Sequence, residues 1–168
     1  MLEIHDRSEA SQGELAAEQL ELCFDLRQKR QLRCKLRSGN EAVLRLSRGP
    51  VLRGGDLLRA SDRTLIEIIA APEKLVQIES NNPGDLARLA YHLGNRHVAV
   101  EVGDRYLRIA EDPVLENMLV GLGAKIQHVV APFEPEAGAY AGAHRYGEGP
   151  SQPSRIHEYV PKPAASDQ

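Results

Sequence analysis

Aromatic residues are scarce in this chain of 168 residues, which has two Phe, five Tyr and no Trp, or 4% in total. A hydrophobic core must therefore be aliphatic, and a row of rings on which nucleic-acid bases could stack is not expected. The formal net charge of −3 also argues against a dedicated nucleic-acid-binding protein. We therefore expect no nucleic acid among the partners.

Long apolar runs are also lacking. No run of 18 apolar residues occurs, charged residues make up 27% of the chain, and the mean hydropathy is −0.39. We therefore expect no membrane-spanning helix and no membrane partner. Residues 1–6 are too polar for a secretory signal, which predicts a cytoplasmic protein. The two cysteines, Cys23 and Cys34, lie in strand-like runs and are expected to be reduced thiols in apolar surroundings.

Alternating apolar residues are present through the first part of the chain. This period of two predicts strands over residues 18–28, 31–37, 42–46 and 64–70, joined by short turns rich in Gly and Pro. The sequence therefore predicts a small all-β domain over residues 1–73. Its strands carry a set of basic side chains that is either a docking surface for a partner protein or the solvated side of the sheet: Arg27, Lys29, Arg30, Arg33, Lys35 and Arg37.

The character of the chain changes over residues 74–137. Asn82-Pro83 and Asp112-Pro113 each place a capping side chain before a proline, a pair typical of helix starts. An amphipathic stripe follows each pair, and the first helix is expected to end at Gly94. Strands are expected over residues 75–79, 98–102, 105–110 and 125–130. The order β-α-β-β-α-β predicts a ferredoxin-like domain, and the whole chain an α+β fold.

The composition of the end of the chain differs from that of both predicted domains. Six of the ten prolines lie between residues 132 and 168, among many Gly, Ser and Ala residues. Such a segment cannot bury enough apolar surface to fold alone, so residues 138–168 are predicted to be a flexible tail.

No motif of an enzyme is present: we find no nucleophile elbow, no phosphate-binding loop and no dinucleotide fingerprint. Six histidines remain as candidates for chemistry. His92 is expected in the last turn of a helix, where a cation is favoured, and His128 shares the apolar parity of its strand. His97 follows Gly94-Asn95-Arg96, where a loop enters a strand, and is expected to be exposed on a rigid frame.

Three motifs resemble those of the urease accessory protein E family of nickel metallochaperones. They are Gly54-Gly55-Asp56-Leu57-Leu58, residues 90–97 (AYHLGNRH) and residues 132–140 (PFEPEAGAY). The resemblance covers the chain in order to about Tyr140. It implies a β-rich domain that engages a partner protein, followed by a ferredoxin-like domain that dimerises.

By this resemblance, His97 matches the family's histidine at the two-fold axis of a homodimer, where the two copies bind Ni²⁺. His144 falls where the family places tail histidines that complete the site, and His157 is the other tail candidate. The implied role is delivery of Ni²⁺ to urease apoprotein with its accessory proteins, including a GTPase. Zn²⁺ or Cu²⁺ can compete, because imidazole suits all three ions. The tail has few histidines, so we expect about one ion per dimer.

Two other functions stay open from the residues alone. A ferredoxin-like domain can instead be a binding module for protein or RNA without any metal. The RNA version needs aromatic rings on the central strands, and residues 98–102 have none while residues 105–110 have only Tyr106. A small hydrolase with His97 as base is the other reading, although no catalytic partner for it is visible.

Overall fold

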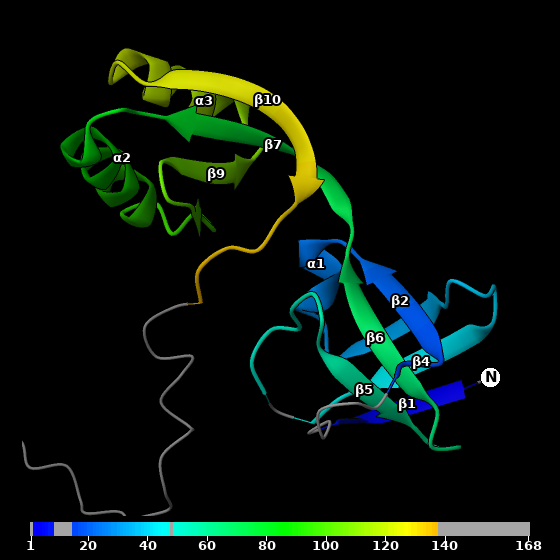
Figure 1. Ribbon diagram of the computed structural model, residues 1–168. Coiled ribbons are helices and arrows are strands. Elements are labelled where there is room, and N and C mark those ends of the chain that lie inside the picture. The colour runs from blue at the N-terminus through cyan, green and yellow to red at the C-terminus, as the bar shows by residue number, and fades with distance from the viewer. Residues whose placement is uncertain (1, 9–14, 48, 138–168) are drawn as a thin grey trace, which may run out of the picture.

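The computed structural model describes residues 2–8, 15–47 and 49–137. Two β-sheets and three helices make up this part of the chain, so the predicted α+β class is confirmed. The two sheets form separate halves, which are joined by the passage from β6 to β7 and by the segment that follows β10 (Figure 1). No helix among the described residues is long and apolar enough to cross a membrane.

The first half is a six-stranded mixed sheet with the order β2-β6-β5-β1-β4-β3. Its strands are β1 (Leu2–Arg7), β2 (Glu18–Leu22), β3 (Gln31–Lys35), β4 (Glu41–Arg45), β5 (Leu57–Ala60) and β6 (Leu65–Ala70). The pairs β1–β4 and β2–β6 are parallel, and the others are antiparallel. The core is aliphatic, as the lack of aromatic residues requires, and includes Ile4, Leu20, Leu44, Leu58, Ile66 and Ile68.

Several details of this half differ from the expectation. The strand predicted over residues 18–28 stops at Leu22, and helix α1 (Phe24–Arg27) follows it. Cys23 therefore precedes a helix rather than lying in a strand, whereas Cys34 does lie in β3. Both thiols are free and half-buried. The alternation had also not indicated β1 and β5, which lie side by side near the middle of the sheet.

The second half has the element order β-α-β-β-α-β. It consists of β7 (Pro72–Glu79), α2 (Pro83–Gly94), β8 (Glu101–Val102), β9 (Tyr106–Ala110), α3 (Pro113–Gly121) and β10 (Lys125–Pro132). The strand order is β10-β7-β9-β8 and every pair is antiparallel. The helices bury one face on the sheet, around Leu89, Leu93, Leu107, Ile109 and Leu119.

Both helices of this half begin as predicted. The side chain of Asn82 accepts a hydrogen bond from the N–H of Gly84, and that of Asp112 accepts from the N–H groups of Val114 and Leu115. One strand is shorter than expected, because only two residues of the predicted segment 98–102 belong to β8. Residues 98–100 therefore form an irregular connection between α2 and the sheet.

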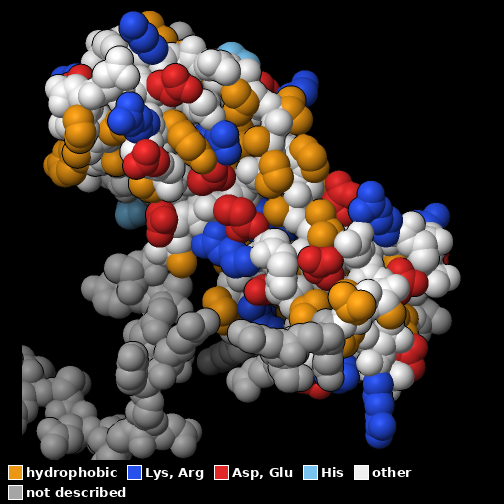
Figure 2. Space-filling view, viewed as in Figure 1, with side chains coloured by type: hydrophobic (Ala, Val, Ile, Leu, Met, Phe, Trp, Pro, Cys, Tyr) orange, Lys and Arg blue, Asp and Glu red, His pale blue; other side chains and the backbone are white. Residues whose placement is uncertain are grey.

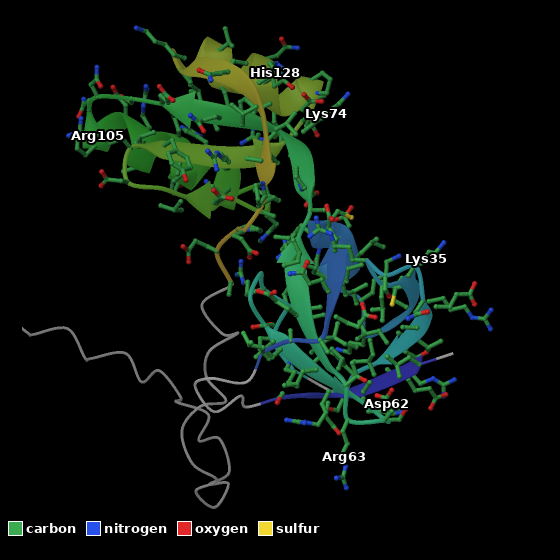
Figure 3. All side chains as sticks on the ribbon, turned by 45° about the vertical axis from the view of Figure 1, so that its right-hand side comes forward. Lys35, Asp62, Arg63, Lys74, Arg105 and His128 are labelled. Carbon is green, nitrogen blue, oxygen red and sulfur yellow. The ribbon has the colours of Figure 1, made fainter. Side chains whose placement is uncertain are left out.

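One member of the basic set predicted for the first half does not lie on the surface. Arg27 is 1% exposed and points into the protein. The other five members of the set, Lys29, Arg30, Arg33, Lys35 and Arg37, are exposed. Lys35 is labelled on β3, an edge strand of this sheet (Figure 3). The predicted tail, residues 138–168, lies outside the described residues.

Candidate metal site

His97 lies just past the end of α2, where the chain leaves the helix toward β8. Its N–H donates to the carbonyl of Gly94 at 3.0 Å, and the N–H of Val98 donates to the carbonyl of Leu93 at 3.3 Å. These two bonds form a Schellman motif, in which a residue beyond the helix end takes the left-handed conformation. His97 does so, with a φ of 55°. Gly94 ends the helix as predicted, yet the left-handed residue is His97 rather than a glycine.

Helix α3 ends with the same pair of bonds. The N–H of Gly123 donates to Val120 at 2.9 Å, and the N–H of Ala124 donates to Leu119 at 3.0 Å. Gly123 takes the left-handed position there, with a φ of 86°. Glycine is preferred at this position because a residue with a Cβ is disfavoured by roughly 1 kcal/mol. The end of α2 therefore contains backbone strain at His97 that is absent at Gly123 at the end of α3. Backbone strain of this kind is concentrated at functional sites.

The imidazole of His97 is exposed, and it makes no hydrogen bond or ion pair within the described part of the chain. Its ring nitrogens are therefore free to bind a divalent ion such as Ni²⁺, Zn²⁺ or Cu²⁺. No group of three or more His, Cys, Asp or Glu residues that could hold a metal occurs among residues 2–8, 15–47 and 49–137. His144 and His157 lie outside these ranges. A tight site at His97 therefore needs ligands from beyond the described residues of one copy.

The half-buried thiol of Cys34 does not offer such a ligand. Burial raises its pKa, which disfavours the thiolate that a metal requires. The expectation that the cysteines are core residues rather than ligands is consistent with this environment.

His128 is exposed on β10, on the outer side of the second half (Figure 3). His128 lies opposite the core residue Val76, so the parity read from the sequence is right, although the side chain is exposed because β10 is an edge strand. Its Nδ1 lies 3.0 Å from Glu111 and its Nε2 lies 3.2 Å from Glu116. The hydrogen bond to Glu111, with the nearby charge of Glu116, raises the pKa of His128. With a carboxylate at each ring nitrogen, His128 has neither nitrogen free to ligate a metal. The sequence signal that was missed is the pair of carboxylates flanking the start of the adjoining helix.

Two of the motifs quoted above meet where the sheets adjoin. Glu134, which follows β10, accepts a hydrogen bond from the N–H of Gly54 at 2.8 Å. Its two carboxylate oxygens pair with Arg27 and Arg53, each at 3.0 Å. We call Arg27, Arg53, Gly54 and Glu134 the Glu134 cluster. Side chains of both charges gather at this junction in the space-filling view (Figure 2).

Arg27 is the buried member of the Glu134 cluster. It donates from one nitrogen to the carbonyl of Leu52 at 3.0 Å and from another to the carbonyl of Phe133. Burial by itself would raise the pKa of Glu134, but the donors of the cluster outweigh it and hold that pKa below its usual range. The Glu134 carboxylate is therefore charged at neutral pH and joins the two halves of the molecule.

Comparison with known families decides where the chain belongs. A family model described as the N-terminal domain of the UreE urease accessory protein matches residues 2–71. A second, described as the C-terminal domain of the UreE urease accessory protein, matches residues 73–159. The chain belongs to the UreE family. The predicted resemblance to urease accessory protein E is thereby confirmed.

Relatives in the UreE family include one named urease accessory protein UreE from Ralstonia nicotianae. It is 52% identical over 131 residues, which is 78% of this chain and 62% of the relative. Urease accessory protein UreE 2 of Pseudomonas syringae pv. syringae is 44% identical over 164 residues, 95% of this chain and 98% of the relative. The chain therefore spans less than two thirds of the Ralstonia relative but nearly all of the Pseudomonas one. Neither comparison tests His97, His144 or His157 as metal ligands, which stay predictions.

Proposed function

We propose that this UreE-family chain is a nickel metallochaperone, which binds Ni²⁺ between two copies of His97 and delivers the ion for assembly of the urease active site. The observation that carries the proposal is the setting of His97. Its exposed imidazole is held past a helix end in a left-handed conformation, at a position where the matching residue of α3 is Gly123. Strained positions of this kind are concentrated at functional sites, which supports a functional role for the histidine.

A second copy of the chain supplies the second imidazole. In a two-fold dimer each residue near the axis faces its own mate, so one His97 per chain becomes two ligands. Apolar side chains suited to such a contact are exposed on both sides of His97 in the sequence: Tyr91 is 66% exposed and Val102 is 54% exposed. His144, and then His157, from the tail would complete the coordination.

The same arrangement suits delivery better than storage. Ligands from a mobile segment can exchange, whereas a closed site of four fixed ligands holds its ion too tightly to release it. In this proposal residues 1–73 dock a partner protein, residues 74–137 dimerise and bind Ni²⁺, and residues 138–168 bring the further histidines. The recipients are urease apoprotein and its accessory proteins, including the GTPase, in the cytoplasm. Zn²⁺ and Cu²⁺ compete for the site.

An RNA-binding role finds less support in the second sheet. Tyr106 is the one Phe, Tyr or Trp in its strands, and the guanidinium of Arg108 lies over its ring, 4.3 Å from the centroid. That face of the ring is therefore covered and does not offer a platform for a base.

Calorimetric titration of the full chain with Ni²⁺ tests the proposal. We expect His97→Ala to weaken binding by about tenfold or more, because it removes a ligand from each copy. His144→Ala should weaken binding while sedimentation still shows a dimer. His5→Ala, which removes a histidine from β1 of the other sheet, is the matched control and should bind like the parent. The proposal is wrong if His97→Ala binds Ni²⁺ as tightly as the parent.

A further inference from the structure

The segment between His97 and β8 is held by hydrogen bonds at both of its ends. At one end, the N–H of Val98 donates to Leu93 of α2. At the other end, the N–H of Glu136 donates to the carbonyl of Val100 at 2.8 Å, and the N–H of Glu134 donates to a carboxylate oxygen of Glu101 at 2.8 Å. The irregular residues 98–100 are therefore held between the end of α2 and the segment that follows β10.

This segment is itself fixed to the other half of the molecule. It passes between the two sheets (Figure 1), and the side chain of Glu134 binds Arg27, Arg53 and the N–H of Gly54 there. The carboxylate of Glu101 that receives its backbone N–H is fixed in turn, since its other oxygen pairs with Arg108 at 3.0 Å. A chain of short bonds thus runs from the first sheet, through Glu134, to the strand that follows His97.

We propose that Glu134 is a positioning residue for His97. By fixing the segment that holds residues 98–101, it keeps the end of α2 from relaxing and keeps His97 in the left-handed conformation. The reason is physical: a strained residue persists only where its surroundings leave it no alternative. When the far end of the connection is released, the turn after α2 can rearrange to an unstrained form and the imidazole changes direction. This inference rests on the proposed role of His97 as a nickel ligand.

The pair Glu134→Gln and Glu136→Gln isolates this role. Each substitution removes one carboxylate from the same segment, but the side chain of Glu136 is exposed and only its backbone N–H takes part in the contacts described. We expect Glu134→Gln to accelerate amide hydrogen exchange at residues 98–101 and to weaken Ni²⁺ binding by about fivefold, the factor equivalent to the strain of one left-handed residue. Glu136→Gln should match the parent in both measurements.

A second pair of variants separates positioning from a general loss of structure. In a His97→Gly background the left-handed conformation carries no strain. Glu134→Gln should therefore accelerate exchange of the Val98 amide less in this background than when His97 is present. A purely structural role predicts the same acceleration in both. Should Glu134→Gln fail to fold, Arg53→Met is the milder variant, because it removes only the partner of one Glu134 oxygen.

The outcomes are distinct. If Glu134→Gln accelerates exchange at residues 98–101 but binds Ni²⁺ like the parent, Glu134 only joins the two sheets and the positioning role is wrong. Equal exchange in Glu134→Gln and Glu136→Gln overturns it as well. Failure of the proposed function looks different, since the parent itself would then bind Ni²⁺ no better than His97→Ala, whichever residue stands at position 134.

Discussion

His97 and Gly123 end two helices through the same pair of hydrogen bonds, yet only one of them is a glycine. The position of His97 could be predicted, since a histidine after a helix end and before a strand is exposed on rigid elements. Its conformation could not, because Gly94 stands where a left-handed glycine is normally inferred. In the structure Gly94 is the last residue of α2, and the left-handed turn falls three residues later.

His97→Gly should stabilise the metal-free protein while removing the metal ligand. Glycine relieves the left-handed strain but adds entropy to the unfolded chain, so the net gain is about 0.5 kcal/mol, and the expected rise in Tm is about 1–2 °C. His97→Ala is the control: it also removes the imidazole, but it keeps a Cβ and should not raise Tm. Thermal melts in the presence of a chelator measure the difference. A lower Tm for His97→Gly than for His97→Ala would contradict the strain argument.

At the scale of elements, starts of helices were predictable and ends of strands were less so. Asn82 and Asp112 cap the helices that follow them within three residues, so the signal is local. Strand β2 ends at Leu22, but the alternation of apolar residues in the sequence continues through Phe24 and Leu26. There the chain turns into α1, and the N–H of Phe24 donates to Glu73 at 2.6 Å, a partner 49 residues away. No local pattern contains such a bond.

The contact of His128 on β10 with Glu111 and Glu116 predicts that stability depends on pH near neutrality. The hydrogen bond to Glu111 raises the folded-state pKa of His128, so its contribution to stability is full below the unfolded pKa of about 6.5 and is lost as pH rises through the folded value. His128→Gln should therefore lower Tm at pH 5.5 and have no effect at pH 9. Added salt should shrink the effect at pH 5.5, because the pair is exposed.

Glu111→Gln is the partner control for this prediction. It removes the carboxylate that makes the shorter contact with His128, at 3.0 Å, and should show the same dependence on pH. Equal losses of Tm for His128→Gln at pH 5.5 and pH 9 would mean that the side chain acts by packing rather than by charge.

At the scale of the whole molecule, the contact between the halves depends on a residue that the sequence placed on the surface. Arg27 belongs to a set of basic residues that were expected on the surface, either as a docking surface or as the solvated side of the sheet. Its partners Leu52 and Glu134 lie 25 and 107 residues further along the chain. An arginine is buried only where several acceptors are brought to it, so its burial could not be inferred before both sheets were in place. Phe133 and Glu134 belong to a motif that was visible in the sequence, but its contact with Arg27 was not.

In Glu134→Gln, the free energy of unfolding should therefore depend less on pH in the acid range than it does in the parent. The bonds from Gly54, Arg53 and Arg27 outweigh burial and lower the folded-state pKa of Glu134. Its charge therefore contributes stability that is full above the unfolded pKa of about 4.3 and is lost as pH falls through the lower folded value. In urea unfolding followed by circular dichroism, the midpoint of Glu134→Gln should lie below that of the parent at pH 6. The two midpoints should converge toward pH 3.

Glu136→Gln is the control and should stay close to the parent at both pH values, since the side chain of Glu136 is exposed. A deficit for Glu134→Gln that is as large at pH 3 as at pH 6 would show that its charge does not hold the two halves together.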